Sequence, residues 1–451
     1  MPHLTTDDGT TGRYLVLFAE DARDAGAAAL SDAAGISMAV AEDATAVPEA
    51  GGGLLFGEID VAVVDAPPDQ ADAAVAAAAD SGAILAVEPE RWVRALEVVT
   101  PYTPEGAATG NGVHAPAAEP PPPLAPPSRS SDYLAGFRDA VLYLTRPDGP
   151  MTADAGLAAA VTAAAVDESQ ATWGIQGVKA VFSCRSGRGI KVAVLDTGMD
   201  LKHPDFAGRN VTSQSFIPGQ AVQDGHGHGT HCIGTATGPK CPAIRPRYGV
   251  AHEADIFAGK VLNDTGRGTD GQILAGINWA IANKCEVISM SLGAPVQAGQ
   301  SYSTVYETVA QRALQAGSLI VAAAGNDSNR PSLIRPVGHP ANCPSILAVA
   351  ALDSSLAIAW FSNRGINPQG GQIDIAGPGV NVYSSVPMPA RYGRKSGTSM
   401  ATPHAAGIAA LLAEANPGAR GAALGQLLAA TAQRLTTLPG ADVGAGLIQA
   451  P

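Results

Sequence analysis

The sequence is poor in aromatic residues, in charged residues and in long apolar runs. Aromatics make up 5% of the 451 residues, so the core must consist mainly of Ala, Val, Ile and Leu. Charged residues make up 15%, which argues against a coiled coil or a disordered polyelectrolyte. Because no stretch of about 18 uninterrupted apolar residues occurs, we expect no membrane span. The net charge of −13 argues against nucleic acids and anionic membranes as partners, since phosphate binding requires clustered Lys and Arg.

Cysteine is also scarce, and the five residues are Cys184, Cys232, Cys241, Cys285 and Cys343. Five cysteines cannot all pair, and none forms a CxxC motif. We therefore expect reduced, mostly buried thiols, with one or two disulfides as the alternative if the protein is exported. The first residues carry two aspartates where a secretory signal needs positive charge and then an apolar stretch. The N-terminus predicts a cytoplasmic protein, or a secreted one if the start site is mis-set.

Strand and helix patterns divide the chain into five parts. We expect a flexible N-terminus at 1–12, a small ferredoxin-like α+β domain at 13–100, a Pro-rich linker at 101–131, a spacer of uncertain structure at 132–168 and a large α/β domain at 169–451. The small domain should follow the order β-α-β-β-α-β, with strands at 14–19, 36–40, 54–65 and 83–87, of which the segment 54–65 is broken near Gly57. In the large domain, a mostly parallel sheet with helices on both faces is predicted by continuous apolar runs at 189–195, 287–290, 319–324 and 346–350.

Three segments each place a reactive side chain beside glycines or at the end of an element. Asp196 follows the apolar run VAVL, His228 lies in DGHGHGTH, and Ser399 lies in SGTSMATPH at the start of a small-residue helix. A helix N-terminus offers free N–H groups, which suit a developing oxyanion. An acid, a histidine and a serine together indicate a serine hydrolase, in which Ser attacks an acyl carbon, His moves the proton and Asp holds the His tautomer.

Five blocks of the sequence resemble the subtilase family of serine peptidases. They read VAVLDTGMD, HGHGTHCIGT, ISMSLGAP, VAAAGND and SGTSMATPHAAG, and the resemblance covers residues 169–450. It implies that Asp196 orients His228, that His228 is the general base, as the first His of HGTH, and that Ser399 is the nucleophile. It also implies that the amide of Asn326 donates to the oxyanion beside the N–H of Ser399. The chain order Asp, His, Ser is that of subtilisin.

Other interpretations of these residues are weaker. His226, His228 and His231 could form a zinc site, but their spacing does not place all three on one helix face and no HExxH motif follows. Taken singly, Asp196 and Ser399 are best interpreted as helix-capping residues. Their combination with His228 and an oxyanion amide favours catalysis.

The resemblance also implies a cleft in which the substrate pairs as a strand with 266–268 and 291–293. The residues expected to contact substrate are Gly266, Gly268, Ser291, Leu292, Gly293, Ala324, Gly325 and Gly338. Since the walls of the first pocket are small and uncharged, we expect a roomy apolar pocket that disfavours Lys and Arg. Asp270 stands where many relatives carry an aromatic residue of the fourth subsite, which indicates tolerance of basic side chains there.

No cofactor is expected for catalysis. Asp205, in HPDF, matches a calcium ligand of the family, but the loop GPKCPAIRPRYG offers few further oxygen ligands. The sequence is compatible with two roles for Asp205: a ligand of a structural calcium ion, or a member of an ordinary turn or surface ion pair. Cys232 resembles the cysteine of the proteinase K-like branch and is expected to be a buried thiol under the catalytic His.

The segments RYLVLFAE and ILAVEPERWV resemble parts of the inhibitor-type propeptide of subtilases, which assists folding and then blocks the active site with its C-terminal tail. Counting along that tail places Leu96 in the first pocket and predicts self-cleavage between Leu96 and Glu97. Cleavage within 150–168 is the competing expectation. A permanent ferredoxin-like regulatory domain is the alternative to a propeptide.

The sequence thus predicts a serine endopeptidase that cuts proteins or peptides through an acyl-enzyme. It predicts an autoprocessed zymogen, inhibited by its own N-terminal domain, and a monomer. A maturation protease or transpeptidase dedicated to one peptide precursor is the related alternative. A non-catalytic scaffold with a subtilase fold is a third hypothesis, against which the intact set of Asp196, His228, Ser399 and Asn326 argues.

Overall fold

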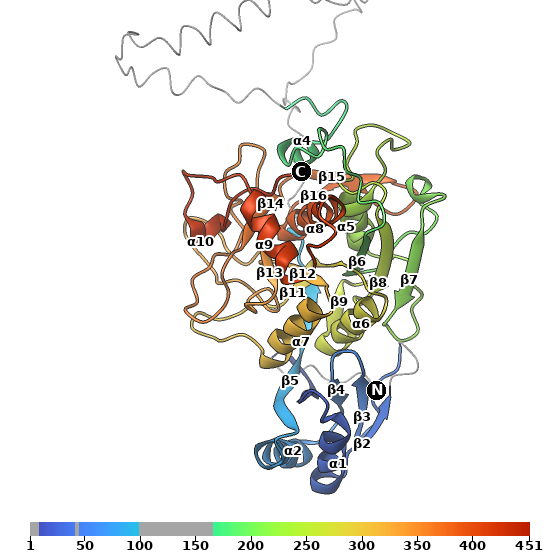
Figure 1. The fold of residues 1–451 in the computed structure, drawn as a ribbon, viewed down its shortest axis with the longest axis vertical. Helices are drawn as coiled ribbons and strands as arrows, with labels where there is room; N and C mark the ends of the chain where they lie inside the picture. The colour runs from blue at the N-terminus through green and yellow to red at the C-terminus, as the bar shows by residue number, and fades with distance from the viewer. Residues whose placement is uncertain (1–8, 41–44, 99–165) are drawn as a thin grey trace, which may run out of the picture. The chain divides into compact units, whose positions relative to one another are not determined.

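The structure is a computed structural model that describes residues 9–40, 45–98 and 166–451 (Figure 1). The Pro-rich linker expected at 101–131 and most of the spacer expected at 132–168 lie outside the described residues. The same holds for most of the N-terminus expected to be flexible.

The N-terminal domain is a mainly antiparallel sheet with two helices on one face. The strand order is β5-β1-β4-β3-β2, with β1 (Thr10–Phe18), β2 (Ser37–Val40), β3 (Gly52–Phe56), β4 (Val61–Val64) and β5 (Ile84–Ala95). The helices are α1 (Arg23–Ala34) and α2 (Pro68–Ser81). Because strand side chains alternate, Val16 and Phe18 pack in the core with Leu30 of α1, while Leu15 and Leu17 belong to the core of the larger domain. Both faces of this sheet are therefore buried.

The N-terminal domain keeps the ferredoxin-like pattern but differs from the expected elements in two places. The strand signal at 54–65, with its expected break near Gly57, is the hairpin β3–β4, which turns at 57–60, where Asp60 has a φ of 47°. The strand expected at 36–40 is β2, an additional edge strand parallel to β3. The last strand continues past 87 to Ala95, because its second half pairs with the larger domain.

The larger domain is built on a parallel sheet with helices on both faces, which confirms the predicted fold class (Figure 1). Its order is β14-β13-β12-β10-β6-β8-β7, with β6 (Lys191–Asp196), β7 (Val211–Ser215), β8 (Asp255–Lys260), β10 (Val287–Met290), β12 (Leu319–Ala323), β13 (Leu347–Leu352) and β14 (Ile375–Pro378). The inner strands β6, β10, β12 and β13 consist mainly of Val, Ile, Leu and Ala, as strands buried on both faces should. The packed helices are α5 (His228–Thr237), α6 (Asp270–Ala282), α7 (Thr304–Gln315) and α8 (Thr398–Ala415).

Shorter elements complete this domain. They are α4 (Trp173–Gly177), a 3-10 helix (Pro204–Phe206), α9 (Ala422–Thr431), α10 (Gly440–Val443), β9 (Arg267–Thr269), β11 (Leu292–Gly293) and the hairpin of β15 (Val382–Ser385) and β16 (Tyr392–Lys395).

The candidate site residues meet at the carboxyl ends of the central strands. Asp196 ends β6, Ser291 follows β10 and Asn326 lies shortly after β12, while α5 and α8 begin with His228 and Thr398. Ligand sites of open parallel sheets form at this edge. β5 enters the same region and runs antiparallel between β9 and β11.

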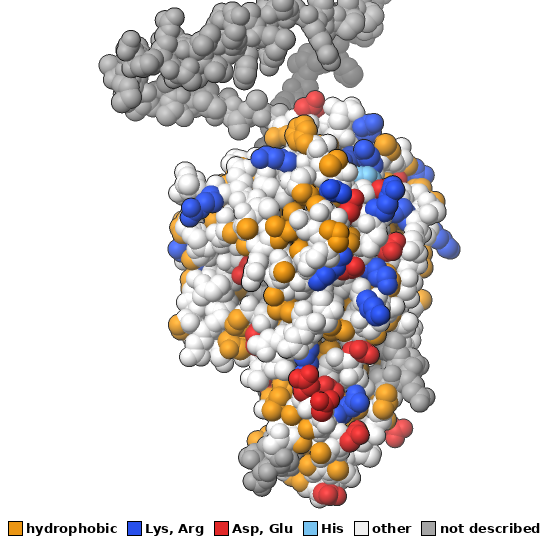
Figure 2. Space-filling model, in the orientation of Figure 1, with side chains coloured by type: hydrophobic (Ala, Val, Ile, Leu, Met, Phe, Trp, Pro, Cys, Tyr) orange, Lys and Arg blue, Asp and Glu red, His pale blue; other side chains and the backbone are white. Residues whose placement is uncertain are grey.

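Two findings bear on the class of protein. No helix among the described residues is long and apolar enough to cross a membrane, and the cytoplasmic location stays a prediction. All five cysteines lie in described regions as free thiols; Cys184 and Cys241 are exposed, and the other three are buried. On the face drawn in Figure 2, Lys and Arg side chains lie scattered among uncharged ones.

Candidate active site

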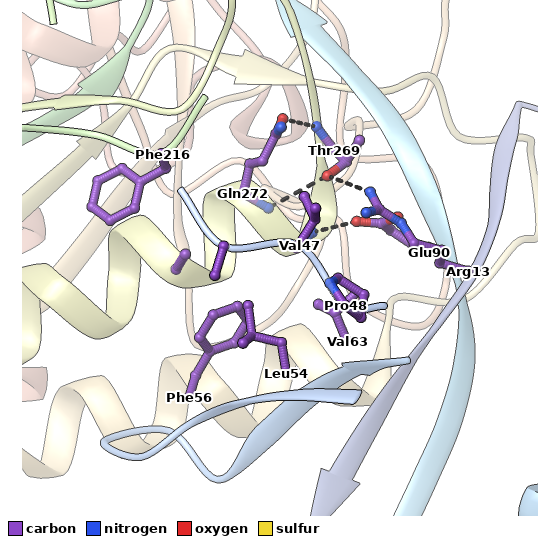
Figure 3. Close-up of a pocket in the computed structure, with 13 residues that line it drawn as sticks. Arg13, Val47, Pro48, Leu54, Phe56, Val63, Glu90, Phe216, Thr269 and Gln272 are labelled. Carbon is purple, nitrogen blue, oxygen red and sulfur yellow. Dashed lines mark hydrogen bonds and ion pairs between the residues drawn. The ribbon is translucent and has the colours of Figure 1, made fainter. Parts of the chain in front are cut away.

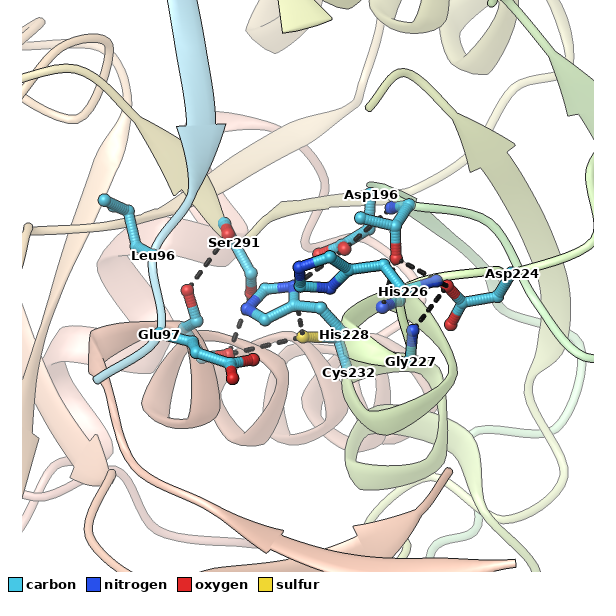
Figure 4. A network of polar contacts seen from close by, with 12 residues as sticks. Leu96, Glu97, Asp196, Asp224, His226, Gly227, His228, Cys232 and Ser291 are labelled. Atoms are coloured by element: carbon cyan, nitrogen blue, oxygen red, sulfur yellow. Dashed lines mark hydrogen bonds and ion pairs between the residues drawn. The ribbon is translucent and has the colours of Figure 1, made fainter. Parts of the chain in front are cut away.

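His228 and Asp196 form a buried, hydrogen-bonded pair (Figure 4). His228 Nδ1 lies 2.7 Å from Asp196 Oδ1, and both residues are 0% exposed. Because a carboxylate can only accept, Nδ1 carries the ring proton and Nε2 is the basic nitrogen. Among the described residues, Nε2 has no hydrogen-bond partner. The pair therefore holds the imidazole in the tautomer that a general base requires.

Asp224 shapes the turn that leads into α5. Its carboxylate accepts hydrogen bonds from the main-chain N–H groups of His226, Gly227 and Thr230. It also accepts from the hydroxyls of Thr197 and Thr230. These bonds join the end of β6 to the start of α5, and so fix Asp196 and His228 relative to each other. Asp224 is absent from the predicted site residues; its only signal in the sequence is an acid directly before GHGHGTH.

Burial and the neighbouring carboxylate act in opposite directions on His228. Burial alone would lower its pKa, but the charge of Asp196 and the hydrogen bond to it hold the pKa well above its ordinary value. Burial lowers the pKa of His231, whose Nε2 donates to the carbonyl oxygen of Val382 at 2.9 Å. Burial also lowers the pKa of His226. Of these three histidines, His228 is the one whose pKa is raised, and it is hydrogen-bonded to a carboxylate.

Ser399 is buried in the first turn of α8. Its hydroxyl donates to the carbonyl oxygen of Ser291 at 3.0 Å. Pro403, inside α8, lacks the N–H that would bond to the carbonyl oxygen of Ser399. That oxygen accepts instead from Ser291 Oγ at 2.9 Å and from Cys232 Sγ at 3.6 Å. Because of the proline, the carbonyl oxygen of Ser399 can link α8 to the end of β10 and to α5. Cys232 is the buried thiol expected under His228.

The side chain of Asn326 is oriented by the start of α8. Its Oδ1 accepts from the N–H of Thr398 at 2.9 Å and from the hydroxyl of Thr398 at 2.8 Å. The amide NH₂ must therefore point the other way. It donates to the carbonyl oxygen of Leu96 at 2.8 Å. A main-chain carbonyl of the N-terminal domain thus accepts a hydrogen bond from this amide. Thr398, which is absent from the predicted set, orients the amide so that its NH₂ group faces that carbonyl.

The segment before Leu96 pairs as an antiparallel strand with two segments that were predicted to line the substrate cleft. Its pairs are Ala95 with Leu292, Arg94 with Gly293 and Arg267, and Val93 with Gly268. The N–H of Leu96 donates to the carbonyl oxygen of Ser291 at 3.3 Å, and the N–H of Val98 donates to that of Ser396 at 2.8 Å. The main chain is therefore held on both sides of the bond between Leu96 and Glu97; Figure 4 shows these two residues beside Ser291 and His228.

Most of the residues predicted to line the cleft contact this strand, namely Gly266, Gly268, Ser291, Leu292 and Gly293. The other three lie together: the N–H of Gly338 donates to the carbonyl oxygen of Ala324 at 2.9 Å, and Gly325 follows with a φ of 111° that glycine adopts readily. Leu96 is 5% exposed, so its apolar side chain is almost fully enclosed.

Among the described residues, the polar partners of the Asp270 carboxylate do not include the fourth residue back from the bond. That residue, counting Leu96 as the first, is the buried Val93. The carboxylate of Asp270 accepts from the N–H of Arg91 at 3.0 Å and lies 2.9 Å from His339 Nε2. His339 Nδ1 in turn lies 3.3 Å from the guanidinium of Arg91. The carboxylate of Asp270 is thus occupied by the main chain of Arg91 and by His339, and the tolerance of basic side chains at the fourth position stays a prediction.

The surroundings of Asp205 do not fit a calcium ion. Its Oδ1 accepts from the N–H of Ala243 at 2.8 Å, and its Oδ2 accepts from the hydroxyls of Tyr248 at 2.6 Å and Tyr392 at 2.9 Å. Burial and the charge of Asp205 raise the pKa of Tyr248, so that hydroxyl stays a donor. Calcium needs several oxygen ligands with free lone pairs, whereas this carboxylate already accepts from three donors.

Comparison with known proteins assigns the family. Residues 187–446, more than half of the chain, match the sequence profile of the subtilase family. The chain belongs to the subtilase family. Its subtilase domain contains Asp196, His228, Asn326 and Ser399 within the matched residues.

Individual subtilisins also match the chain. The chain is 42% identical over 237 residues to subtilisin E of Bacillus subtilis (strain 168), a match that covers 51% of this chain and 57% of that protein. It is 38% identical over 250 residues to subtilisin DY of Bacillus licheniformis, covering 55% and 85%. It is 40% identical over 252 residues to subtilisin BL of Lederbergia lenta, covering 54% and 85%. The chain thus spans little more than half the length of subtilisin E.

Proposed function

We propose that this subtilase is a serine endopeptidase made as a zymogen, with Ser399 as nucleophile, His228 as general base, Asp196 as its orienting acid and Asn326 in the oxyanion hole. The observation that carries the proposal is the 2.8 Å hydrogen bond from Asn326 Nδ2 to the carbonyl oxygen of Leu96. A peptide carbonyl of the chain itself lies at the donor that would stabilise an oxyanion. Protein or peptide substrates would bind in the same strand pairing, and a monomer suffices.

In the proposed reaction, Ser399 Oγ attacks the carbonyl carbon of the residue bound as Leu96 is, and His228 Nε2 takes the hydroxyl proton. The amide of Asn326 and the N–H of Ser399 stabilise the resulting oxyanion, while Asp196 stabilises the imidazolium. His228 then gives the proton to the leaving amine, and water hydrolyses the acyl-enzyme by the same steps. No cofactor takes part.

One rearrangement must precede this attack. The Ser399 hydroxyl donates to the carbonyl oxygen of Ser291 at 3.0 Å, so it has to rotate about its Cα–Cβ bond to reach His228. The partnerless Nε2 of His228 is free to receive it. Such loose geometry before reaction is common for catalytic hydrogen bonds.

The N-terminal domain is proposed to be the inhibitor because its contacts extend beyond the cleft. The N–H of Thr304, at the start of α7, donates to Glu88 at 2.7 Å, and the N–H of Gly271, at the start of α6, donates to Glu90 at 3.0 Å. Carboxylates at helix N-termini are favourable because of the helix dipole. Glu90 also pairs with Arg13 at 2.7 Å, beside a cavity of about 20 Å³ between the two domains (Figure 3).

A fluorophosphonate probe tests the assignment of the nucleophile. After the N-terminal domain has left, the wild type should carry the label on Ser399, located by mass spectrometry, and Ser399→Ala should carry none. Ser301→Ala, which removes an exposed serine, is the matched control and should be labelled like the wild type. A label on another residue would refute the assignment.

Poor hydrolysis of casein beside efficient cutting of one precursor would favour the dedicated maturation protease.

A further inference from the structure

The residue after the proposed scissile bond is held by a cation. Glu97 Oε2 lies 2.6 Å from Nζ of Lys395, and the two side chains are 23% and 18% exposed. Lys395 is the last residue of β16, so a strand fixes the base of its side chain. The proposed reaction makes no use of Lys395, and the family motifs give it no role.

The surroundings of this pair favour a negative charge. Burial would raise the pKa of Glu97, but the hydrogen bond and charge of Lys395, together with His228 and His226, bring it below its ordinary value. Burial lowers the pKa of His226, so Lys395 supplies the permanent positive charge. Glu97 is therefore held in its ionised form.

Main-chain contacts fix the backbone position of Glu97, so a different side chain there would occupy the same place. The N–H of Val98 donates to the carbonyl oxygen of Ser396 at 2.8 Å, so the chain is in register just after Glu97. Gly397 approaches so closely that a Cβ added to it would lie 3.4 Å from the Cα of Glu97. A substrate bound in the same register would present the side chain of its first leaving-group residue to Lys395.

We propose that Lys395 forms an anion-selective subsite, so that the enzyme prefers substrates with Glu or Asp directly after the scissile bond. The inference rests on the proposed function and narrows its substrate class. The pair is largely shielded from water, which strengthens the attraction between the two charges. A substrate Glu also loses its hydration on binding, and this cost offsets part of the attraction. We therefore expect kcat/KM for a Glu substrate to exceed that for a Gln substrate by about three- to tenfold. A Lys at this position would face a like charge and be cut more slowly than Gln.

Internally quenched peptides carrying the sequence of residues 91–98, with Glu, Gln or Lys at the position of Glu97, test the proposal on enzyme matured from the full-length chain. The wild type should cut the Glu peptide fastest and the Lys peptide slowest. Lys395→Met should cut the Glu and Gln peptides equally, and Lys395→Glu should prefer Lys. Lys240→Met, which removes an exposed lysine elsewhere, is the matched control and should keep the wild-type order.

A second measurement needs no substitution. Raising the salt concentration should shrink the preference of the wild type for Glu over Gln, because salt screens charges that water can reach. Equal cutting of the Glu and Gln peptides by the wild type at low salt, or an unchanged preference in both Lys395 variants, would overturn the subsite and leave the peptidase standing. If the wild type cuts none of the peptides, the proposed function fails and the subsite fails with it.

Discussion

At the scale of single residues, the amide of Asn326 is the group whose removal should affect turnover most specifically. Asn326→Leu should lower kcat by about 10²–10³ with little change in KM, as loss of the oxyanion donor does in subtilisin. Thr398→Val removes the hydroxyl that orients the amide at 2.8 Å. It should cost less, about tenfold, since the N–H of Thr398 still holds Oδ1. Steady-state hydrolysis of an apolar chromogenic peptide measures both. A wild-type kcat in Asn326→Leu would contradict the role of this amide.

The acid limb of the pH profile should report His228. Its imidazolium form cannot accept a proton from Ser399, so activity is present above the raised pKa of His228 and is lost as the pH falls through it. Asp196→Asn removes the charge that raises this pKa and leaves the burial that lowers it. The limb should therefore move to lower pH, while kcat falls by about 10⁴. An acid limb of kcat/KM that stays in place in Asp196→Asn would show that another group titrates.

The residues proposed for catalysis could be chosen from the sequence because each stands in a block of small residues at a fixed spacing. The supporting residues could not. Thr398 acts on an amide 72 positions away, and Lys395 meets a carboxylate 298 positions away. Asp224 binds only main-chain groups and hydroxyls of its own turn and of Thr197. The roles of Thr398 and Lys395 depend on contacts that no local pattern contains, and that of Asp224 depends on the geometry of a turn that the sequence does not specify.

At the scale of elements, β5 extends furthest past its predicted end. The apolar run stops at Val87, where Glu88, Pro89 and Glu90 follow, so local periodicity ends the strand there. The structure continues it to Ala95, because β9 and β11 supply pairing partners from far along the chain. By contrast, β10 has the predicted bounds, since a strand buried on both faces is a continuous apolar run.

The pocket at the end of β5 predicts which residue can precede the cut. Leu96 is 5% exposed, and enclosing an unpaired guanidinium there would be costly. Leu96→Arg should slow self-cleavage of the full-length chain at least about tenfold, whereas Leu96→Met, of similar volume, should process at nearly the wild-type rate. The time course of chain shortening on a denaturing gel measures this. Equal processing of the two variants would rule out an apolar first pocket.

At the scale of the whole molecule, the N-terminal domain and the subtilase domain share one hydrophobic core, which includes Leu15, Leu17 and Val93 beside residues of the parallel sheet. Such packing is equally compatible with a permanent accessory domain and with a propeptide. The two differ in whether the bond after Leu96 is cut. The expectation of cleavage within 150–168 falls outside the described residues, apart from 166–168.

N-terminal sequencing of the purified wild type, beside Ser399→Ala and the Ser301→Ala control, tests the central claim that the chain binds its own Leu96–Glu97 bond as a substrate. The account predicts a mature chain that begins at Glu97 in the wild type and in Ser301→Ala, and an uncut chain in Ser399→Ala. A wild type that stays full length through purification while fully active would contradict the claim, as would a new N-terminus within 150–168 with the Leu96–Glu97 bond unbroken.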